Sequence, residues 1–71
     1  MNTQKDIPAI IKAARIRAGL TQKELGEKIG YSGESQERAI RNIENGSRGV
    51  PIEKARALIT ALDLTFDDII P

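Results

Sequence analysis

The chain has 71 residues, of which 39% are hydrophobic and 30% are charged, and its formal net charge is +1. This length predicts one domain over residues 1–71 with a single small core. The sequence contains neither cysteine nor histidine, which excludes disulfides, zinc sites of the Cys/His type and catalysis by a Ser-His or Cys-His couple. We therefore expect no enzymatic activity, no bound metal and no cofactor.

The distribution of apolar and charged residues bears on location and partners. No stretch approaches the ~20 apolar residues of a membrane span, and residues 1–5 lack the apolar segment of a signal peptide, so we expect a cytoplasmic protein without a membrane partner. Residues 1–60 carry all 11 basic side chains and 7 of the 10 acidic ones, whereas residues 61–71 carry 3 acidic ones and no basic one. One face can therefore be basic, although ordinary surface charge explains the same distribution.

Apolar residues recur with the helical period of 3.6, which predicts an all-α fold of five short helices. The first helix is expected over residues 7–18, between the N-cap residue Asp6 and the terminating Gly19. The predicted inner face of this helix holds Ile7, Ile11, Ala14 and Ala18.

Residues 22–29 are predicted to form the second helix, which Gly30 ends. Thr21 and Glu24 have the spacing of a capping box, in which each side chain accepts a hydrogen bond from the other residue's backbone N–H. Gly26 lies in the middle of this helix, where it costs about 1 kcal/mol relative to alanine. We therefore expect another backbone to pass close to Gly26.

A connector over residues 31–36 precedes a third helix, which ends at Asn45 and Gly46. The buried side of the third helix is expected to hold Ala39, Ile40 and Ile43. Pro51 precedes a fourth helix over residues 52–62. Its predicted inner residues are Ile52, Ala55, Leu58, Ile59 and Leu62. Thr65 is predicted to cap a short fifth helix. That last helix carries the apolar side chains of Phe66, Ile69 and Ile70.

The second and third helices have the layout of a helix-turn-helix. Burying one side of the third helix leaves positions 37, 38, 41 and 42 on the other side. A helix reads the major groove of DNA when one face is held by the protein and the other offers long polar side chains. Arginine suits guanine, asparagine suits adenine, and glutamate can accept from cytosine. A helical bundle whose polar face is merely solvated fits this pattern equally well.

Two sequence blocks resemble the lambda-repressor and Cro-like helix-turn-helix family, also called the xenobiotic-response-element family. Residues 19–25 read GLTQKEL, with Arg15 four positions ahead, and residues 40–46 read IRNIENG. The resemblance continues through the fourth and fifth helices and covers about residues 7–70. It implies a compact five-helix bundle in which the third helix is the recognition helix.

The chain departs from the family pattern at two places. Nine residues separate Gly30 from Ile40, where the family usually has five. Either the turn or the recognition helix is therefore longer, and the possible N-caps are Ser32, Ser35 and Gln36. The second departure is Gly26, where the family usually has alanine.

The resemblance also implies a role for each matched side chain. Arg38 and Asn42 would read bases, Glu37 would face the groove, and Arg41 would contact a base or a phosphate. The residues implied in phosphate contacts are Thr21, Gln22, Asn45, Ser47 and Arg48. Arg15 and Glu44 would form a buried ion pair. Structural explanations stay open for three of these residues: capping for Thr21, helix-dipole stabilisation for Glu37, and an i, i+4 pair with Glu37 for Arg41.

The function implied by the resemblance is sequence-specific binding of double-stranded DNA by a transcriptional repressor of phage, plasmid or bacterial type. A homodimer would bind a palindromic operator whose half-sites lie about 34 Å apart. Dimer contacts would come from Phe66, Ile69 and Ile70, which alternatively close the core. The competing function is that of an antitoxin or similar module, which binds a protein partner such as a toxin and binds DNA secondarily.

Overall fold

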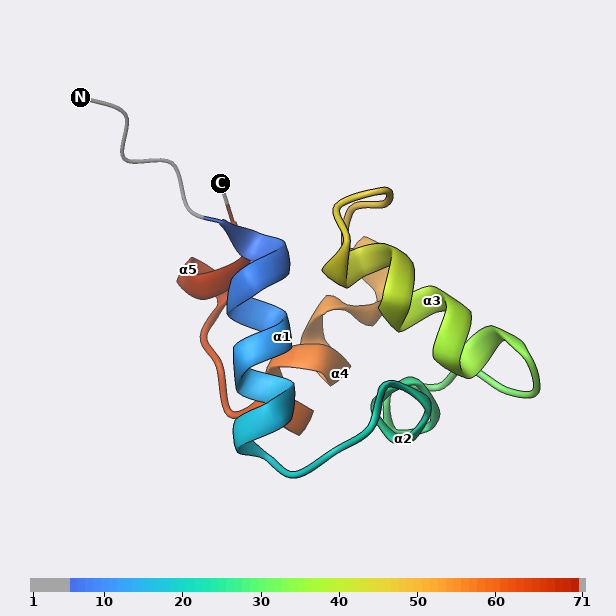
Figure 1. Ribbon diagram of the computed structural model, residues 1–71. Coiled ribbons are helices and arrows are strands. Elements are labelled where there is room, and N and C mark those ends of the chain that lie inside the picture. The colour runs from blue at the N-terminus through green and yellow to red at the C-terminus, as the bar shows by residue number, and fades with distance from the viewer. Residues whose placement is uncertain (1–5, 71) are drawn as a thin grey trace.

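The computed structural model describes residues 6–70, so residues 1–5 and 71 of the predicted domain lie outside the described part. Within that part the chain is all-helical, as the periodicity predicted. The helices are α1 (Ile7–Arg17), α2 (Gln22–Lys28), α3 (Ser35–Glu44), α4 (Ile52–Leu62) and α5 (Phe66–Ile69). Figure 1 shows α5 on one side of α1 and the α2–α3 pair on the other. No helix of the described residues combines the length and the apolar character needed to cross a membrane.

Short polar side chains begin three of the helices. Asp6 Oδ1 accepts a hydrogen bond from the backbone N–H of Ala9 at 3.3 Å, which caps α1. The predicted capping box begins α2: the Glu24 N–H donates to Thr21 Oγ1 at 3.0 Å, and the Thr21 N–H donates to Glu24 Oε1 at 2.8 Å. Thr65 stands at the N-cap of α5, and its N–H donates to Asp68 Oδ2 at 2.9 Å. Local sequence thus defines where these helices start.

The core lies where α1, α2, α3 and α4 meet. Each of these helices contributes a large side chain that is fully buried: Ile11 from α1, Leu25 from α2, Ile40 and Ile43 from α3, and Leu58 from α4. Burying a side chain of this size is worth roughly 1.5–3 kcal/mol relative to leaving it in water. This shared core holds α3 to the other helices by its apolar side.

Two predicted inner residues are in fact exposed. Ile52 has 89% of its surface exposed, because it is the first residue of α4 and stands at the end of that helix. Ala18 is exposed because α1 ends at Arg17 and Ala18 is its C-cap, at the turn into Gly19. Periodicity predicts which face a residue occupies, but it does not show where the neighbouring helices end.

The four additional residues before Ile40 are divided between the turn and α3. The N-cap is Glu34, two residues before the cap position that the family spacing gives, so α3 gains two residues and the turn gains the other two. Glu34 already has right-handed helical dihedral angles, and the Ser35 N–H donates to the Ser32 carbonyl at 3.2 Å. Because a hydrogen-bonded turn leads directly into α3, neither Ser32 nor Ser35 caps the helix with its hydroxyl.

Candidate nucleic-acid interface

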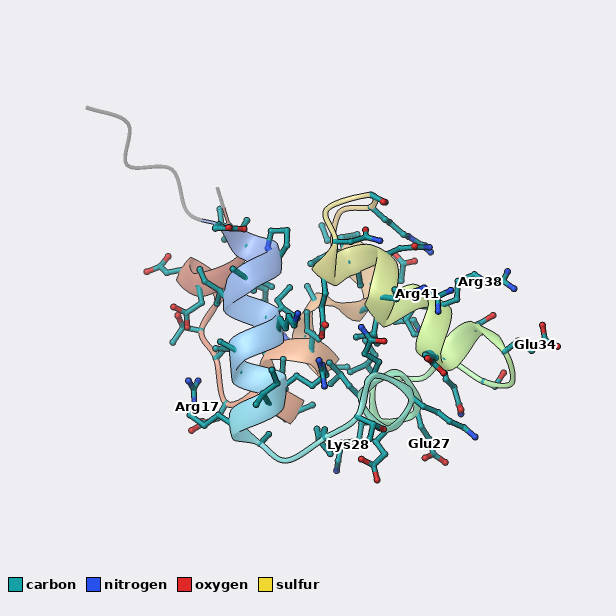
Figure 2. All side chains as sticks on the ribbon, in the orientation of Figure 1. Arg17, Glu27, Lys28, Glu34, Arg38 and Arg41 are labelled. Atoms are coloured by element: carbon teal, nitrogen blue, oxygen red, sulfur yellow. The ribbon has the colours of Figure 1, made fainter. Side chains whose placement is uncertain are left out.

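Helix α3 has one buried and one exposed side. Ala39, Ile40 and Ile43 are at most 4% exposed, whereas Arg38 and Arg41 are exposed. Figure 2 shows both arginine side chains pointing away from the helices that form the core. An amphipathic helix held in this way presents long hydrogen-bond donors to solvent while its own position is fixed by packing.

The C-terminal end of α3 is held by a partly buried ion pair. Glu44 Oε2 lies 2.6 Å from Arg15 Nε, and their side chains are 4% and 12% exposed. The Glu44 Oε1 atom accepts from Arg15 Nη2 and from the Gln22 side-chain amide, both at 3.2 Å. Arg15 Nη1 also donates to the Leu20 carbonyl at 2.8 Å. The two residues for which the family resemblance implied an ion pair therefore connect α1, α2 and α3.

The N-terminal end of α3 is held by a close backbone approach. An ideal Cβ placed on Gly26 would lie 2.1 Å from the Gln36 carbonyl oxygen and 2.7 Å from its Cα. These distances are shorter than any ordinary contact, so a side chain at position 26 would force α2 and α3 apart. The prediction that another backbone passes Gly26 is confirmed. Because α3 already begins at Ser35, the Gln36 backbone is part of this helix where it passes Gly26.

Two hollows flank the exposed side of α3. One has a volume of about 170 Å³ and is lined by Tyr31, Ser35, Arg38, Ala39, Asn42 and Arg48. The other has a volume of about 500 Å³ and is lined by Lys23, Gly33, Glu34, Gln36, Glu37, Arg38 and Arg41. Four basic and two acidic residues therefore line the two hollows together. Neither Tyr31 nor Ser35 was predicted on this surface, although the spacing of Ser35 from Arg38 and Asn42 places it there.

The arginines of α3 are only loosely paired. Arg38 Nη2 lies 3.8 Å from Glu34 Oε1, and Arg41 Nη1 lies 4.0 Å from Glu37 Oε2. All four side chains are more than half exposed, and exposed i, i+4 pairs contribute only about 0.3–0.5 kcal/mol. Neither pair therefore prevents its arginine from contacting a ligand.

Residues with an implied phosphate-binding role lie near the C-terminal end of α3. Gln22 lies there through its hydrogen bond to Glu44, at the start of α2. In the following loop the Ser47 N–H donates to Asn45 Oδ1 at 2.8 Å, and the Arg48 N–H donates to the Asn42 carbonyl at 3.2 Å. These local bonds order the loop beside α3, in which Arg48 is exposed.

Thr21 stabilises the charged carboxylate of Glu24 at the start of α2. The hydrogen bond from the Thr21 backbone, and then that from its side chain, hold the pKa of the Glu24 carboxyl below its usual range. Both groups stabilise the charged form of the carboxylate. Thr21 therefore acts as a cap, whatever its role toward a ligand.

A separate apolar surface is formed by Ile52, Phe66 and Ile70. Phe66 and Ile70 are each 49% exposed, and together with Ile52 they line a hollow of about 280 Å³ that also includes Val50, Ala55 and Ile69. Of the three side chains expected either to form dimer contacts or to close the core, Ile69 is 8% exposed and packs with the core. Ile52, which the sequence assigned to the core, belongs to the exposed surface instead.

Comparison with known proteins identifies the arrangement. A family model described as Helix-turn-helix matches residues 11–69, which include the ion pair, the close approach at Gly26 and the whole of α3. No curated protein and no solved structure matches the chain. Among the described residues, no group of three or more His, Cys, Asp or Glu side chains is arranged to hold a metal ion.

Proposed function

Because the chain belongs to the lambda-repressor and Cro-like helix-turn-helix family of DNA-binding transcription regulators, we propose that it binds a specific double-stranded DNA sequence and represses transcription there. The observation that carries this proposal is the division of α3 into a buried apolar side and an exposed side with two loosely paired arginines. This division is what insertion into a major groove requires.

Each side chain of the interface has a proposed task. Arg38 and Asn42 read bases, because arginine matches guanine and asparagine matches adenine by paired hydrogen bonds. Arg41 contacts a base or a phosphate, and Glu37 faces the groove beside it. The family resemblance assigns phosphate contacts to Thr21, Gln22, Asn45, Ser47 and Arg48. Phosphate contacts fix the orientation of a protein on the duplex and carry no sequence information by themselves.

The protein is proposed to be a repressor of phage, plasmid or bacterial type and to act as a homodimer. The exposed side chains of Ile52, Phe66 and Ile70 supply an apolar surface that a second copy would cover. The acidic residues Asp63 and Asp67 lie close in the sequence to Phe66 and Ile70 and would be repelled by DNA. This repulsion favours a protein, and not DNA, as the partner of the apolar surface. Two copies related by a two-fold axis would bind palindromic half-sites about 34 Å apart.

Selection of bound sequences from random duplex DNA, with the full chain, tests the proposal. We expect enrichment of one palindromic sequence, and binding that weakens steeply with salt because phosphate contacts release counterions. Selection without any enrichment, or no shift of a labelled duplex pool at low salt, would overturn the DNA-binding proposal.

A second experiment tests the dimer surface. Phe66→Glu introduces a charge into the apolar surface and is expected to convert a dimer to a monomer in analytical ultracentrifugation. Ile16→Glu is the matched control, since Ile16 is 60% exposed on α1 and outside that surface. A monomeric wild type that copurifies with a different protein in equal amount would overturn the homodimer and support the antitoxin alternative.

A further inference from the structure

Ser35 lies on the same face of α3 as the two proposed base-reading residues. It precedes Arg38 by three positions and Asn42 by seven, a spacing that puts all three on one side of a helix. The same hollow of about 170 Å³ is lined by all three, with Arg48 also in its wall. Since the family spacing starts the recognition helix two residues later, the resemblance assigns no role to Ser35.

The hydroxyl of Ser35 has no structural task in the described part of the chain. Ser35 is exposed, and its side chain makes no hydrogen bond within residues 6–70. The start of α3 is stabilised by the backbone instead, through the bonds from Ser35 to Ser32 and from Gln36 to Gly33. Removing this hydroxyl should therefore leave the fold and the stability unchanged.

The backbone around Ser35 is fixed by the contact between the neighbouring Gln36 and Gly26. Without a side chain on Gly26, α2 supports α3 at a position that lies before the family's helix start. The two residues added to α3 are consequently held by the same packing that holds the rest of the helix. A side chain on such a segment can take part in recognition because its position is defined before binding.

We propose that Ser35 is a specificity-determining residue, and that the base-reading face of α3 begins there, one turn before Arg38. This inference rests on the proposed function. The hydroxyl both donates and accepts, so it can contact either a donor or an acceptor on a base edge. Ser35 then sets the preference at the base pair next to the one read by Arg38, while Arg38 and Asn42 set the preferences further along the site.

The test measures base preference one position at a time. Dissociation constants are determined for the selected site and for every single base-pair change of it, with the wild type and with Ser35→Ala. Arg38→Ala should lose the preference at one base pair of the site. At the base pair next to it, Ser35→Ala is expected to lower the discrimination between the preferred and the changed base pair about 2- to 10-fold. Discrimination at the other positions should stay as in the wild type.

Three further variants separate this role from other roles of the same segment. Ser32→Ala removes a hydroxyl from the turn, outside the hollow, and should retain the wild-type profile. Ser35→Thr keeps the hydroxyl and should retain discrimination, whereas Ser35→Asn should shift the preference at that position toward adenine. Thermal unfolding of all variants should match that of the wild type.

An unchanged profile for Ser35→Ala would overturn the inference, and so would an equal loss of affinity for every sequence, which would indicate a phosphate contact. Either result leaves the proposed function intact, because the wild type would still select its site. If the wild type itself selects no sequence, the proposed function fails, and the inference about Ser35 fails with it.

Discussion

The two ends of α3 are held by different means. At the C-terminal end, charged and polar side chains from α1 and α2 meet the carboxylate of Glu44. At the N-terminal end, α2 supports α3 by the lack of a side chain at Gly26, which lets the backbone of Gln36 come close. Helix α3 is therefore fixed by specific hydrogen bonds at one end and by close packing at the other.

The largest expected loss of stability follows from removing the ion pair at the C-terminal end of α3. Glu44→Ala leaves the Arg15 guanidinium without its carboxylate in a largely buried place and should lower the free energy of unfolding by about 3 kcal/mol. Chemical denaturation measures this loss. Glu27→Ala is the matched control, because Glu27 is exposed on α2 and makes no ion pair among the described residues. Equal stability of the two variants would show that the ion pair does not hold α3.

A smaller loss is expected when the N-terminal end is disturbed. Gly26→Ala gains helix propensity, but it must move the Gln36 backbone, and the net cost should be about 2 kcal/mol in chemical denaturation. Gly49→Ala provides the control, since a Cβ there meets nothing within 4 Å, and its stability should be within about 0.5 kcal/mol of the wild type. A Gly26→Ala variant more stable than the wild type would contradict the close approach.

The exposed side of α3 links the two ends and should give a still smaller effect, in binding rather than in stability. Arg38→Ala and Asn42→Ala are each expected to weaken binding to the preferred site by about 1 to 2 kcal/mol and to relax specificity at one position. Gln22→Ala should weaken binding to all sequences alike. Competition titrations with changed sites distinguish these patterns, and equal losses on every sequence for Arg38→Ala and Asn42→Ala would remove both from the base-reading role.

The smallest expected effect on stability comes from the capping box at the start of α2. Helix α2 supports both ends of α3, through Gln22 and through Gly26. Because the pKa of Glu24 is lowered in the folded protein, its carboxylate stabilises the fold at neutral pH. That contribution is lost as the pH falls below the ordinary glutamate range and through the folded pKa. The stability difference between the wild type and Glu24→Gln should therefore shrink between about pH 5 and pH 3. Parallel pH profiles for the two proteins would contradict this capping role.

Sequence reasoning succeeded where a feature depends on neighbours along the chain. The capping box of Thr21 and Glu24, the ends of α4 and the apolar side of α3 follow from local spacing, and the structure agrees with all of them. Ile52 and Ala18 show where it failed: both were predicted to face inward, yet both are exposed. Burial at a helix end depends on where the neighbouring helices end, and a single sequence does not carry that information.

The sequence by itself determined that the chain is helical, that it belongs to a helix-turn-helix family, and that a backbone must pass close to Gly26. Only the tertiary structure decided how the additional residues are divided between the turn and α3, and therefore that Ser35 stands in line with Arg38 and Asn42. The physical reason is that the hydrogen bonds that start a helix can form at several adjacent residues at similar cost. Packing against α2 selects one of these starting points.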